Sequence, residues 1–527
     1  MIRIKQIKVS IKDNTDIKDI ICKKYSLKEE DIISFKIKKK SIDARNKKEI
    51  FYVYEIDLEL NNEDKFLKKK YKNISKTKKE YYKIPTSGEK TLPNRPIIVG
   101  SGPAGLFCGL LLAESGYNPL IIERGEKIED RVNRVDKFWK DNKLNPNSNV
   151  QFGEGGAGTF SDGKLNTLVK DKEHRGLKVF ETFVECGADN SILYLQKPHI
   201  GTDVLRNVII NLRNKIISLG GEFLYNTTLT DINIKDNKVK SITINNKDEI
   251  PCDVLVLAIG HSARDTFNML YKKSISMKAK PFAVGVRVQH NQDEISFSQY
   301  GENYKYLPPA SYKLTYQTKK GRGVYSFCMC PGGYVVNASS EEGRLAINGM
   351  SYQKRDSKNA NSAIIVTVSP NDFGTNPLDG IVFQRKLEED TYKLGNGRIP
   401  TQRLEDFYGN KKTTKLGKIE PITKGDYILT DITKVLPSFI TESLKEAFLY
   451  YGTKIKGFDD PDTLISIIES RTSSPIRIER NDFLESNIKG IYPCGEGSGY
   501  AGGITTSAMD GIKVSEQIIM KYKKSSN

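Results

Sequence analysis

Cysteine and histidine are both scarce in this sequence. Its 527 residues include only seven cysteines and four histidines. The cysteines are odd in number and scattered, which argues against a disulfide framework and suits a reducing compartment, so we expect few or no structural disulfides. No group of His, Cys and Asp residues has the spacing of a ligand set, so we expect no metal site.

Long apolar runs are also missing. No segment reaches the roughly 18 residues that cross a bilayer, and the first residues do not join a basic start to an apolar stretch. We therefore expect a cytoplasmic protein that does not enter a membrane. With 38% hydrophobic and 28% charged residues, the chain can still bury large cores and is long enough for about three domains.

Acidic residues are too few to balance the basic ones, and the formal net charge is +18. More than half of this excess lies in residues 1–95, which hold 26 Lys and Arg against 15 Asp and Glu. Within them, residues 66–83 mix Lys with Tyr. The Lys-rich composition of the whole chain favours a solvated basic surface, and binding of a polyanion, such as a nucleic acid, or of an acidic partner is the alternative.

The first 60 residues predict a small α+β domain. Alternating apolar residues and β-branched content indicate a strand, a helix and two further strands, at residues 1–11, 16–27, 31–42 and 49–60. We place this basic domain at residues 1–84, with residues 66–83 as a basic connector and residues 85–95 as a linker that bears Pro, Gly and Ser.

A dinucleotide-binding motif begins at Pro96. An apolar strand leads to Gly100-x-Gly102-x-x-Gly105, then a helix, then a second strand that ends at Glu123. In this motif the first glycine makes a tight turn, the second lets the backbone approach a pyrophosphate, and the third lets helix and strand pack closely. The helix N-terminus offers free N–H groups to the phosphates.

Glu123 follows Gly105 by 18 residues, close to the spacing of about 20 at which an acid accepts the ribose hydroxyls. Two other matches to the motif, at Gly153 and Gly497, are not followed by a strand that carries an acid. We therefore predict a single nucleotide fold and no dedicated nicotinamide domain, so that NAD(P)H would dock only transiently.

Two later segments favour FAD over NAD. The first is a buried strand that ends in Ala258-Ile259-Gly260, and the second is a strand followed by Gly495-Glu496, a glycine cluster and a closing helix. Together with the Pro96–Gly125 motif, they resemble the three sequence marks of glutathione-reductase-type FAD folds. The resemblance implies that Glu496, where Asp is common, holds the ribityl chain and that Gly502 to Ile504 lie near the flavin ring.

A closer resemblance covers the chain from about Pro96 to its end, with the small N-terminal domain included. Segments such as QFGEGGAGTFSDGKLNT, QKPHIGTDVL, LAIGHSARDTFNML, KPFAVGVRVQH, FCMCPGGYVVNASSEEGRLAINGMS and ESRTSSPIRI resemble a bacterial family of FAD-dependent dehydrogenases. This resemblance indicates the fold and the cofactor, but it does not indicate the substrate. The cofactor contacts we predict are Gly100, Ser101, Gly102, Pro103, Ala104, Gly105, Glu123, Arg124, Arg131, Gly158, Ser161, Gly260, Gly495, Glu496, Gly502, Gly503 and Ile504.

Candidate catalytic residues come from two residue types. His199 and His261 lie in loops beside apolar segments, where an acid/base group is placed, although a hydrogen-bonded loop histidine is the alternative. Cys328 and Cys330 are two apart, so on a strand they point the same way; a dithiol near a flavin could relay electrons, whereas packing is the commoner use of free Cys.

Two loops carry candidate binding groups. The loop from Gly153 to Leu165 has five glycines and ends in Ser161, Asp162 and Lys164, which suits a backbone that lies against a flat ring or a phosphate. Arg471 and Arg477 flank a hydroxyl cluster after a segment that we expect to be helical. They are candidates for binding an anionic substrate or the flavin phosphates, and a buried interdomain ion pair is the alternative.

The predicted architecture is α/β. It joins the small N-terminal α+β domain to a doubly wound, Rossmann-like FAD-binding domain made of residues 96–275 and 470–527, with a strand-rich cap inserted at residues 276–469. The segments FAVGVRV, YSFCMC, YVVNAS and AIIVTV would form the cap sheet over the flavin.

The predicted function is that of a flavoprotein oxidoreductase, a dehydrogenase or reductase that moves a hydride between the flavin N5 atom and a small molecule. Two alternatives belong to other classes. The basic N-terminal region would fit an RNA-modifying flavoenzyme. FAD could also serve a structural role or a reaction without redox change, such as hydration.

Overall fold

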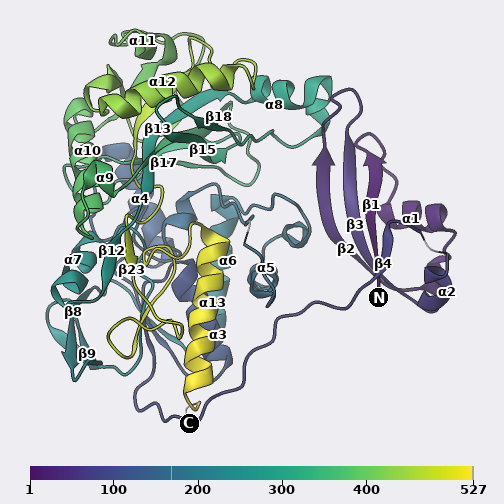
Figure 1. The fold of residues 1–527 in the computed structure, drawn as a ribbon, viewed down its shortest axis with the longest axis horizontal. Coiled ribbons are helices and arrows are strands. Elements are labelled where there is room, and N and C mark those ends of the chain that lie inside the picture. The colour runs from purple at the N-terminus through teal and green to yellow at the C-terminus, as the bar shows by residue number, and fades with distance from the viewer. Residues whose placement is uncertain (70, 168, 525–527) are drawn as a thin grey trace.

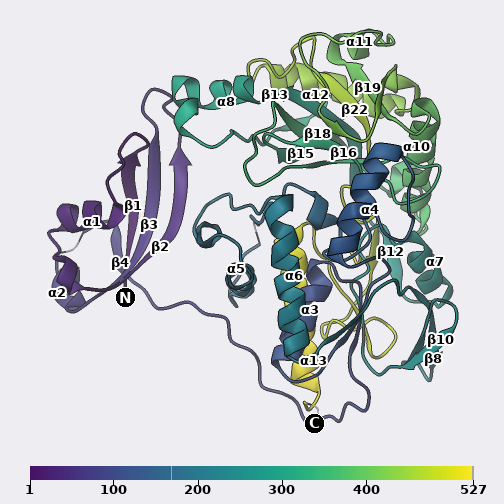
Figure 2. The same cartoon turned by 180° about the vertical axis from the view of Figure 1, so that it is seen from behind.

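A computed structural model describes residues 1–69, 71–167 and 169–524. It has three units: a small N-terminal sheet, an α/β unit around a parallel sheet, and a larger cap built on a mostly antiparallel sheet (Figures 1 and 2). Mixed α/β structure agrees with the class predicted from the sequence. Over the described ranges, no helix is both long enough and apolar enough to cross a membrane.

The N-terminal unit is an antiparallel sheet with the strand order β2–β3–β1–β4 and a helix, α1, on one face. The sequence alternation puts Ile4 of β1 and Ile56 and Leu58 of β3 on the face that packs against Ile21 of α1. The predicted order of strand, helix, strand and strand is thereby confirmed. The bounds are β1 (Ile2–Ser10), α1 (Ile17–Tyr25), β2 (Ile32–Asp43), β3 (Phe51–Leu60) and β4 (Ile74–Lys76).

The basic segment of residues 66–83 is only partly a connector. Phe66 is buried in the core of the N-terminal unit, and β4 adds a strand beside β1. The unit is held to the rest of the chain through Lys40 of β2, whose N–H donates to the Tyr194 carbonyl at 2.7 Å and whose carbonyl accepts from the Gln196 N–H at 2.9 Å.

The α/β unit contains a five-stranded parallel sheet in the order β24–β11–β5–β6–β7. Its last strand in the chain, β24, lies beside β11, which in turn pairs with β5. The end of the chain thus returns to the sheet that contains β5, as predicted. The bounds are β5 (Ile97–Val99), β6 (Leu120–Ile122), β7 (Glu222–Leu224), β11 (Leu255–Leu257) and β24 (Ile491–Pro493).

Alternate side chains of this sheet enter two different cores. Ile98 faces the core formed with α3, α6 and α13, whereas Ile97 and Val99 face the strands β8 to β10 and helix α7. Helix α13 packs along α3 (Figure 1). The bounds are α3 (Pro103–Glu114), α6 (Thr202–Ser218), β8 (Leu229–Lys235), β9 (Lys238–Ile244), β10 (Asp248–Pro251), α7 (Arg264–Lys272) and α13 (Ile504–Lys521).

The cap sheet has the strand order β14–β15–β18–β13–β22–β19–β21. The FAVGVRV, YSFCMC and AIIVTV segments are neighbouring strands of it, namely β13, β15 and β18, which confirms that part of the prediction. The bounds are β13 (Phe282–Asn291), β14 (Thr315–Gln317), β15 (Gly323–Cys330), β18 (Asn359–Val368), β19 (Ile399–Arg403), β21 (Tyr427–Leu429) and β22 (Leu464–Glu469).

Two predictions for the cap were wrong. The YVVN segment is strand β16 (Tyr334–Asn337), which pairs with β17 (Ile347–Met350) and β20 (Thr423–Lys424) in a separate small sheet. The segment before Arg471, expected to be helical, is β22, an interior strand of the cap sheet. Its apolar run is short, and periodicity alone does not separate a buried strand from a buried helix at that length.

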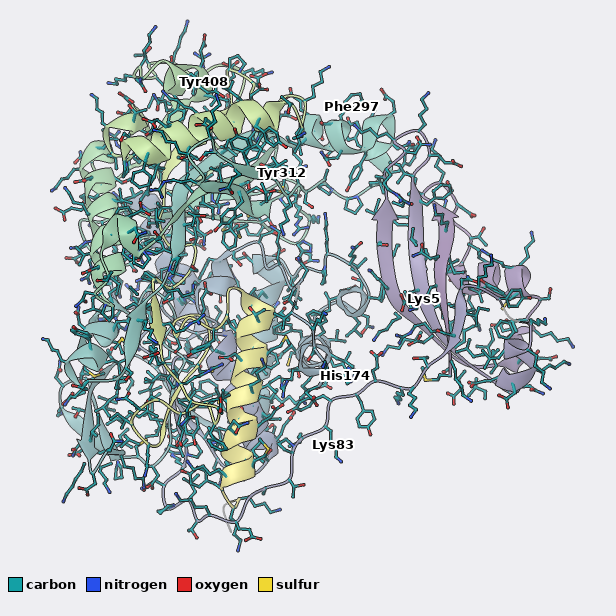
Figure 3. All side chains as sticks on the ribbon, in the orientation of Figure 1. Lys5, Lys83, His174, Phe297, Tyr312 and Tyr408 are labelled. Atoms are coloured by element: carbon teal, nitrogen blue, oxygen red, sulfur yellow. The ribbon has the colours of Figure 1, made fainter. Side chains whose placement is uncertain are left out.

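Helices that the strand-rich prediction did not include complete the cap. Phe448 of α12 packs in one core with Val286 of β13 and Ile364 of β18. Tyr312, labelled in Figure 3, belongs to the same core. Its ring lies edge-on to that of His290. The bounds are α8 (Gln292–Tyr300), α10 (Asp379–Gly395) and α12 (Ser438–Gly452).

The chain passes between the α/β unit and the cap twice, and the two crossings pair with each other. Strand β12 (Met277–Ala279) leads into the cap and β23 (Ile476–Ile478) leads back, and the two are antiparallel neighbours. Their pairing brings the cap over the carboxyl ends of the parallel strands.

Candidate functional site

A cavity of about 550 Å³ lies between the carboxyl ends of the parallel strands and the cap. Gly100, Ala258 and Cys494, which follow β5, β11 and β24, line its lower side, and Phe327 and Cys328 of β15 line it from the cap. Open parallel sheets bind ligands at this edge because the loops there turn outward around a crevice.

The turn between β5 and α3 contains the three motif glycines, and each has a different structural role. Gly100 has a φ of +101°, and a Cβ on Gly105 would collide with the Gly100 carbonyl. Gly102 faces the cavity, where an added Cβ would meet only the Cα of Gly156, at 3.7 Å. Helix α3 begins at Pro103 and points its N-terminus into the cavity, where the helix dipole favours an anion such as a pyrophosphate.

Glu123, predicted as a ribose ligand, already accepts hydrogen bonds from the protein. One carboxylate oxygen accepts from the N–H and the hydroxyl of Ser101 at 2.9 and 2.8 Å, and the other accepts from the N–H groups of Gly125 and Gly153 at 2.9 and 3.0 Å. A carboxylate has about four acceptor positions. Glu123 therefore ties three loops together, and a ribose hydroxyl would share these oxygens.

Arg131 holds the glycine-rich loop in shape from behind. Its guanidinium is fully buried and does not line the cavity, and burial lowers the pKa of Arg131 to about 10. It remains charged at neutral pH and organises the loop whose Gly156 and Gly158 do line the cavity. The carbonyls that accept from it belong to Asn149, Val150, Gly153, Glu154 and Gly156.

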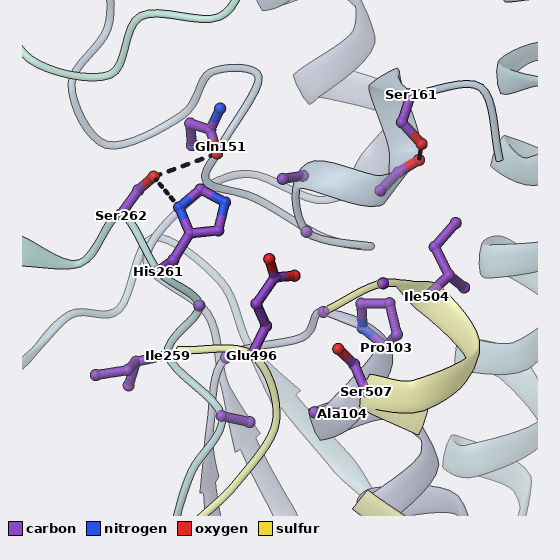
Figure 4. A pocket seen from close by; sticks show the side chains of 18 of the residues that line it. Pro103, Ala104, Gln151, Ser161, Ile259, His261, Ser262, Glu496, Ile504 and Ser507 are labelled. Atoms are coloured by element: carbon purple, nitrogen blue, oxygen red, sulfur yellow. Dashed lines mark hydrogen bonds between the residues drawn. The ribbon is translucent and has the colours of Figure 1, made fainter. Parts of the chain in front are cut away.

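The opposite wall is the N-terminus of α13. Gly502 and Gly503 precede this helix, and an added Cβ on either would meet nothing within 4 Å, so bare backbone faces the cavity. Glu496 points into the cavity from the loop before them (Figure 4). Burial raises the pKa of Glu496 to about 7, partly offset by the charge of Lys280. Near neutral pH this side chain can therefore donate or accept a hydrogen bond.

His261 forms part of the wall together with Ser262 and Gln151. Its Nδ1 lies 3.0 Å from the Ser262 hydroxyl, which in turn donates to Gln151 Oε1 at 3.2 Å (Figure 4). Burial, with the positive charges of Arg471 and Arg264 close by, lowers the pKa of His261 to about 3. The imidazole is therefore neutral at physiological pH, and a proton-donating role as imidazolium does not fit this environment.

We expect His261 to titrate far below neutral pH. Because burial lowers its pKa from 6.5 to about 3, the neutral ring stabilises the fold fully above pH 6.5, and this contribution is lost as the pH falls toward 3. NMR of the imidazole C–H signals, which come from only four histidines, measures it, with His261→Gln for assignment. A midpoint for His261 near its ordinary value would contradict the structure.

His199 lies behind the cavity rather than in its wall. It is next to the fully buried Asp162, whose carboxylate pairs with Lys164 at 3.0 Å and with Arg355 at 2.6 Å. Burial and the charge of Arg355 lower the pKa of His199 to about 4. Of this cluster, Lys164 lines the cavity, so we regard His199 as a support for the loop that carries Lys164.

Cys328 and Cys330 do not sit on a regular strand. The pairing of β15 with β18 runs from Phe327 opposite Ala363 to Cys330 opposite Asn361, so β15 has one extra residue in between. Cys328 occupies this β-bulge with a φ of +43°, lines the cavity and is partly exposed, whereas Cys330 is fully buried. The prediction of a shared strand face did not include this bulge.

The two predicted arginines have separate positions. Arg471 lines the cavity and forms a buried ion pair with Glu388 of α10 at 2.8 Å, which fits the interdomain alternative. Arg477 does not line the cavity; it donates to the Gly499 carbonyl at 3.3 Å and lies over the ring of Tyr500.

Sixteen of the predicted site residues therefore line one cavity, and seven do not. Those that do not line it are Ser101, Gly105, Arg131, His199, Cys330, Arg477 and Gly495. The sequence did not single out several side chains that line the cavity, because residues of these types are also common in ordinary cores and loops. They include Gln151 and Phe152 in the QFGEGG segment, Thr227 and Leu229 near Arg124, and Asn348 and Glu469 on the cap.

Comparison with known sequences places this chain among relatives. An uncharacterized protein of Clostridium beijerinckii is 48% identical to it, and the match covers 99% of each chain. Residues 281–472, most of the cap, match the family described as "FAD-dependent protein, C-terminal domain-like". Residues 1–59 match a domain of unknown function, DUF8436.

Solved structures are similar only at a low level. An L-proline dehydrogenase from P. horikoshii is 12% identical with a TM-score of 0.37, covering 83% of this chain and 96% of that one. An E. coli quinol fumarate reductase is 11% identical with a TM-score of 0.37, covering 82% and 70%. A glycine oxidase from Bacillus cereus is 12% identical with a TM-score of 0.30, covering 82% and 96%.

Proposed function

We propose a function for this protein from two findings. The chain belongs to the same family as the Clostridium beijerinckii protein, and its cap matches the C-terminal domain of an FAD-dependent protein. Its cofactor is therefore FAD. On this premise the protein is an FAD-dependent oxidoreductase that moves a hydride between FAD and a small molecule bound under the cap. Within the flavoproteins, we place its FAD fold with the glutathione-reductase type.

The observation that carries this proposal is one cavity whose wall combines the features of an FAD site. It is lined by Glu123 and Arg124, by Gly102 at the N-terminus of α3, and by Gly503 at the N-terminus of α13. These three features suit the adenosine, the pyrophosphate and the ring of FAD. Bare glycine backbone at Gly102 and Gly503 leaves the space that a closely held cofactor needs.

The residues around the proposed ring position can orient a substrate and exclude water. Bound FAD supplies the hydride acceptor or donor. Above it, Phe327 and Asn348 of the cap and Lys164 of the glycine-rich loop line the remaining space. The ammonium of Lys164 and the amide of Asn348 offer hydrogen bonds to a polar substrate, while Phe327 and the cap sheet shield the reaction from solvent.

We also propose that a nicotinamide cofactor reaches the ring only through this cavity. In the described residues, one parallel strand pair combines the glycine turn, a helix and an acid, the pair of β5 and β6. The Gly153 match forms the loop that Arg131 holds, and the Gly497 match is the turn before α13. We therefore do not propose a second dinucleotide-binding fold.

Stopped-flow reduction tests the proposed function. The purified protein is expected to be yellow and to bleach reversibly without oxygen when NADH, NADPH or an organic donor is added, with a rate that saturates at high donor concentration. Weak donor binding is expected because FAD already fills most of the site. A tight 1:1 complex of NAD(P)H with the FAD-loaded protein would contradict the single nucleotide fold, and a protein whose flavin no donor reduces would contradict the redox role.

A further inference from the structure

Cys328 and Cys330 stand at the place where the cap meets the proposed flavin position. Cys328 lines the cavity next to Phe327, and Cys330 lies directly behind it, fully buried. We propose that these two cysteines form a redox-active dithiol that exchanges two electrons with FAD. This inference rests on the proposed FAD site and assigns to it a second electron store within the protein.

The backbone around Cys328 is shaped to present its thiol. The extra residue of the β-bulge and the φ of +43° belong to a conformation that residues other than glycine rarely adopt. Such conformations cost about 1–3 kcal/mol and cluster at functional sites, although an outlier alone does not prove a function. Here the bulge turns the residue toward the cavity, as bulges beside active sites do.

Cys330 contacts Cys328 through its thiol. The Cys330 thiol points back along the chain and donates a hydrogen bond to the carbonyl oxygen of Cys328, which lies 3.2 Å from the Cys330 Sγ. A bond between the two would close a small ring. Strained and accessible disulfides of this kind are the labile, catalytic ones rather than the structural ones.

Positive charge surrounds the pair. Arg287, fully buried on β13, donates to the Cys328 carbonyl at 3.2 Å, and its Nη1 lies 3.9 Å from the Cys330 sulfur. Lys164 donates to the carbonyl of Met329, between the two cysteines. Glu469 balances Arg287 through an ion pair of 2.8 Å, and Asp162 pairs with Lys164, so the cations are held in place.

The two thiols consequently differ. The adjacent Cys330 thiol, with the charges of Lys164 and Arg287, lowers the pKa of Cys328, whereas burial raises the pKa of Cys330. Low-pKa thiols in electropositive, partly exposed positions are the reactive ones. By contrast, burial raises the pKa of Cys108 and of Cys252 to about 12, as expected for cysteines that only pack in a core.

The proposed step is balanced within the holoenzyme. The thiols of Cys328 and Cys330 lose two protons and two electrons as the Sγ–Sγ bond forms, and FAD takes up both electrons and both protons to give reduced FAD. In reverse, reduced FAD returns the pair to the dithiol. The cysteine pair can therefore store two electrons from a donor while one small molecule leaves the cavity and another enters.

A reductive titration of the oxidised holoenzyme tests this inference. Dithionite added without oxygen should deliver four electrons per FAD to the wild type and only two to Cys328→Ser/Cys330→Ser. Cys252→Ala, which removes an equally buried cysteine outside the cavity, should still take up four. Mass spectrometry of alkylated peptides should find the segment with Cys328 and Cys330 two hydrogens lighter in the oxidised wild type.

The outcomes separate this inference from the proposed function. Uptake of two electrons by the wild type, with both cysteines alkylated in the oxidised protein, would overturn the dithiol and leave the flavin role intact. Absence of FAD, or a flavin that accepts no electrons, would overturn the proposed function instead. The peptide measurement uses the wild type alone, so the test does not depend on whether the double variant folds.

Discussion

Gly102→Val is expected to give a folded but colourless protein. The residue has ordinary backbone angles, with a φ of −72°, and an added Cβ meets only Gly156 Cα at 3.7 Å. The valine side chain therefore fits the protein and extends into the space assigned to the pyrophosphate. The ratio of flavin to protein absorbance should fall to background, while the thermal unfolding midpoint stays close to that of wild-type protein stripped of FAD.

Gly105→Ala is the matched control for this variant. A Cβ on Gly105 would collide with the carbonyl of Gly100, so that α3 and β5 could not keep their distance. This smaller substitution should lower the stability of the FAD-free protein, which Gly102→Val should not do. Full yellow occupancy in Gly102→Val would remove the assignment of the α3 N-terminus to FAD.

The part of this site that the sequence predicts is the part encoded locally. Gly100, Gly102 and Gly105 lie within one turn, and the strands on either side of them are short apolar runs. Their conformations depend on neighbours a few residues away, so spacing alone indicates the motif. The return of β24 to β11 was predictable for a different reason, since the resemblance to known FAD folds supplied the topology.

What the sequence could not show are the contacts between loops. Glu123 accepts from Gly153, 30 residues further along the chain, and Arg131 binds carbonyls of the same loop. Neither contact leaves a pattern in composition or periodicity. Both residues were expected to touch the cofactor, whereas Arg131 supports the loop from behind, and the carboxylate of Glu123 is largely used by protein donors.

The cap shows a second limit of prediction from the sequence. Strand β16 is a short, mostly buried segment like β15, yet it joins another sheet, because pairing depends on which partner the turns bring near. The bulge at Cys328 likewise appears only when β15 is aligned with β18. Register is a property of two strands, so one strand's sequence cannot specify it.

A buried cluster of charges joins the cap to the α/β unit. Glu388 of α10 is completely buried and accepts from Arg264 at 2.7 and 2.8 Å, from Arg471 at 3.0 and 2.8 Å, and from the Ser470 hydroxyl at 2.7 Å. Arg264 also donates to Glu341 at 2.7 Å. The two guanidinium groups hold the pKa of Glu388 well below its usual range, so the carboxylate remains charged down to acidic pH.

Glu388→Ala is expected to destabilise the protein by about 3–5 kcal/mol, because removing one member of a buried ion pair leaves uncompensated charge in the interior. Arg264 keeps a single carboxylate, that of Glu341, and Arg471 keeps only the hydroxyls of Ser262 and Ser340. Urea unfolding followed by flavin and tryptophan fluorescence measures the loss.

The neighbouring residue supplies the control. Glu389 pairs with Lys393 at 2.6 Å on the exposed face of the same helix, where solvent screens the ion pair and it contributes little to stability. Glu389→Ala should therefore unfold almost as the wild type does. Because Arg471 also donates to Ser262 behind His261, loss of Glu388 should loosen this wall and weaken FAD binding, whereas Glu389→Ala leaves it unchanged. Equal stability of the two variants would show that the buried cluster does not hold the cap in place.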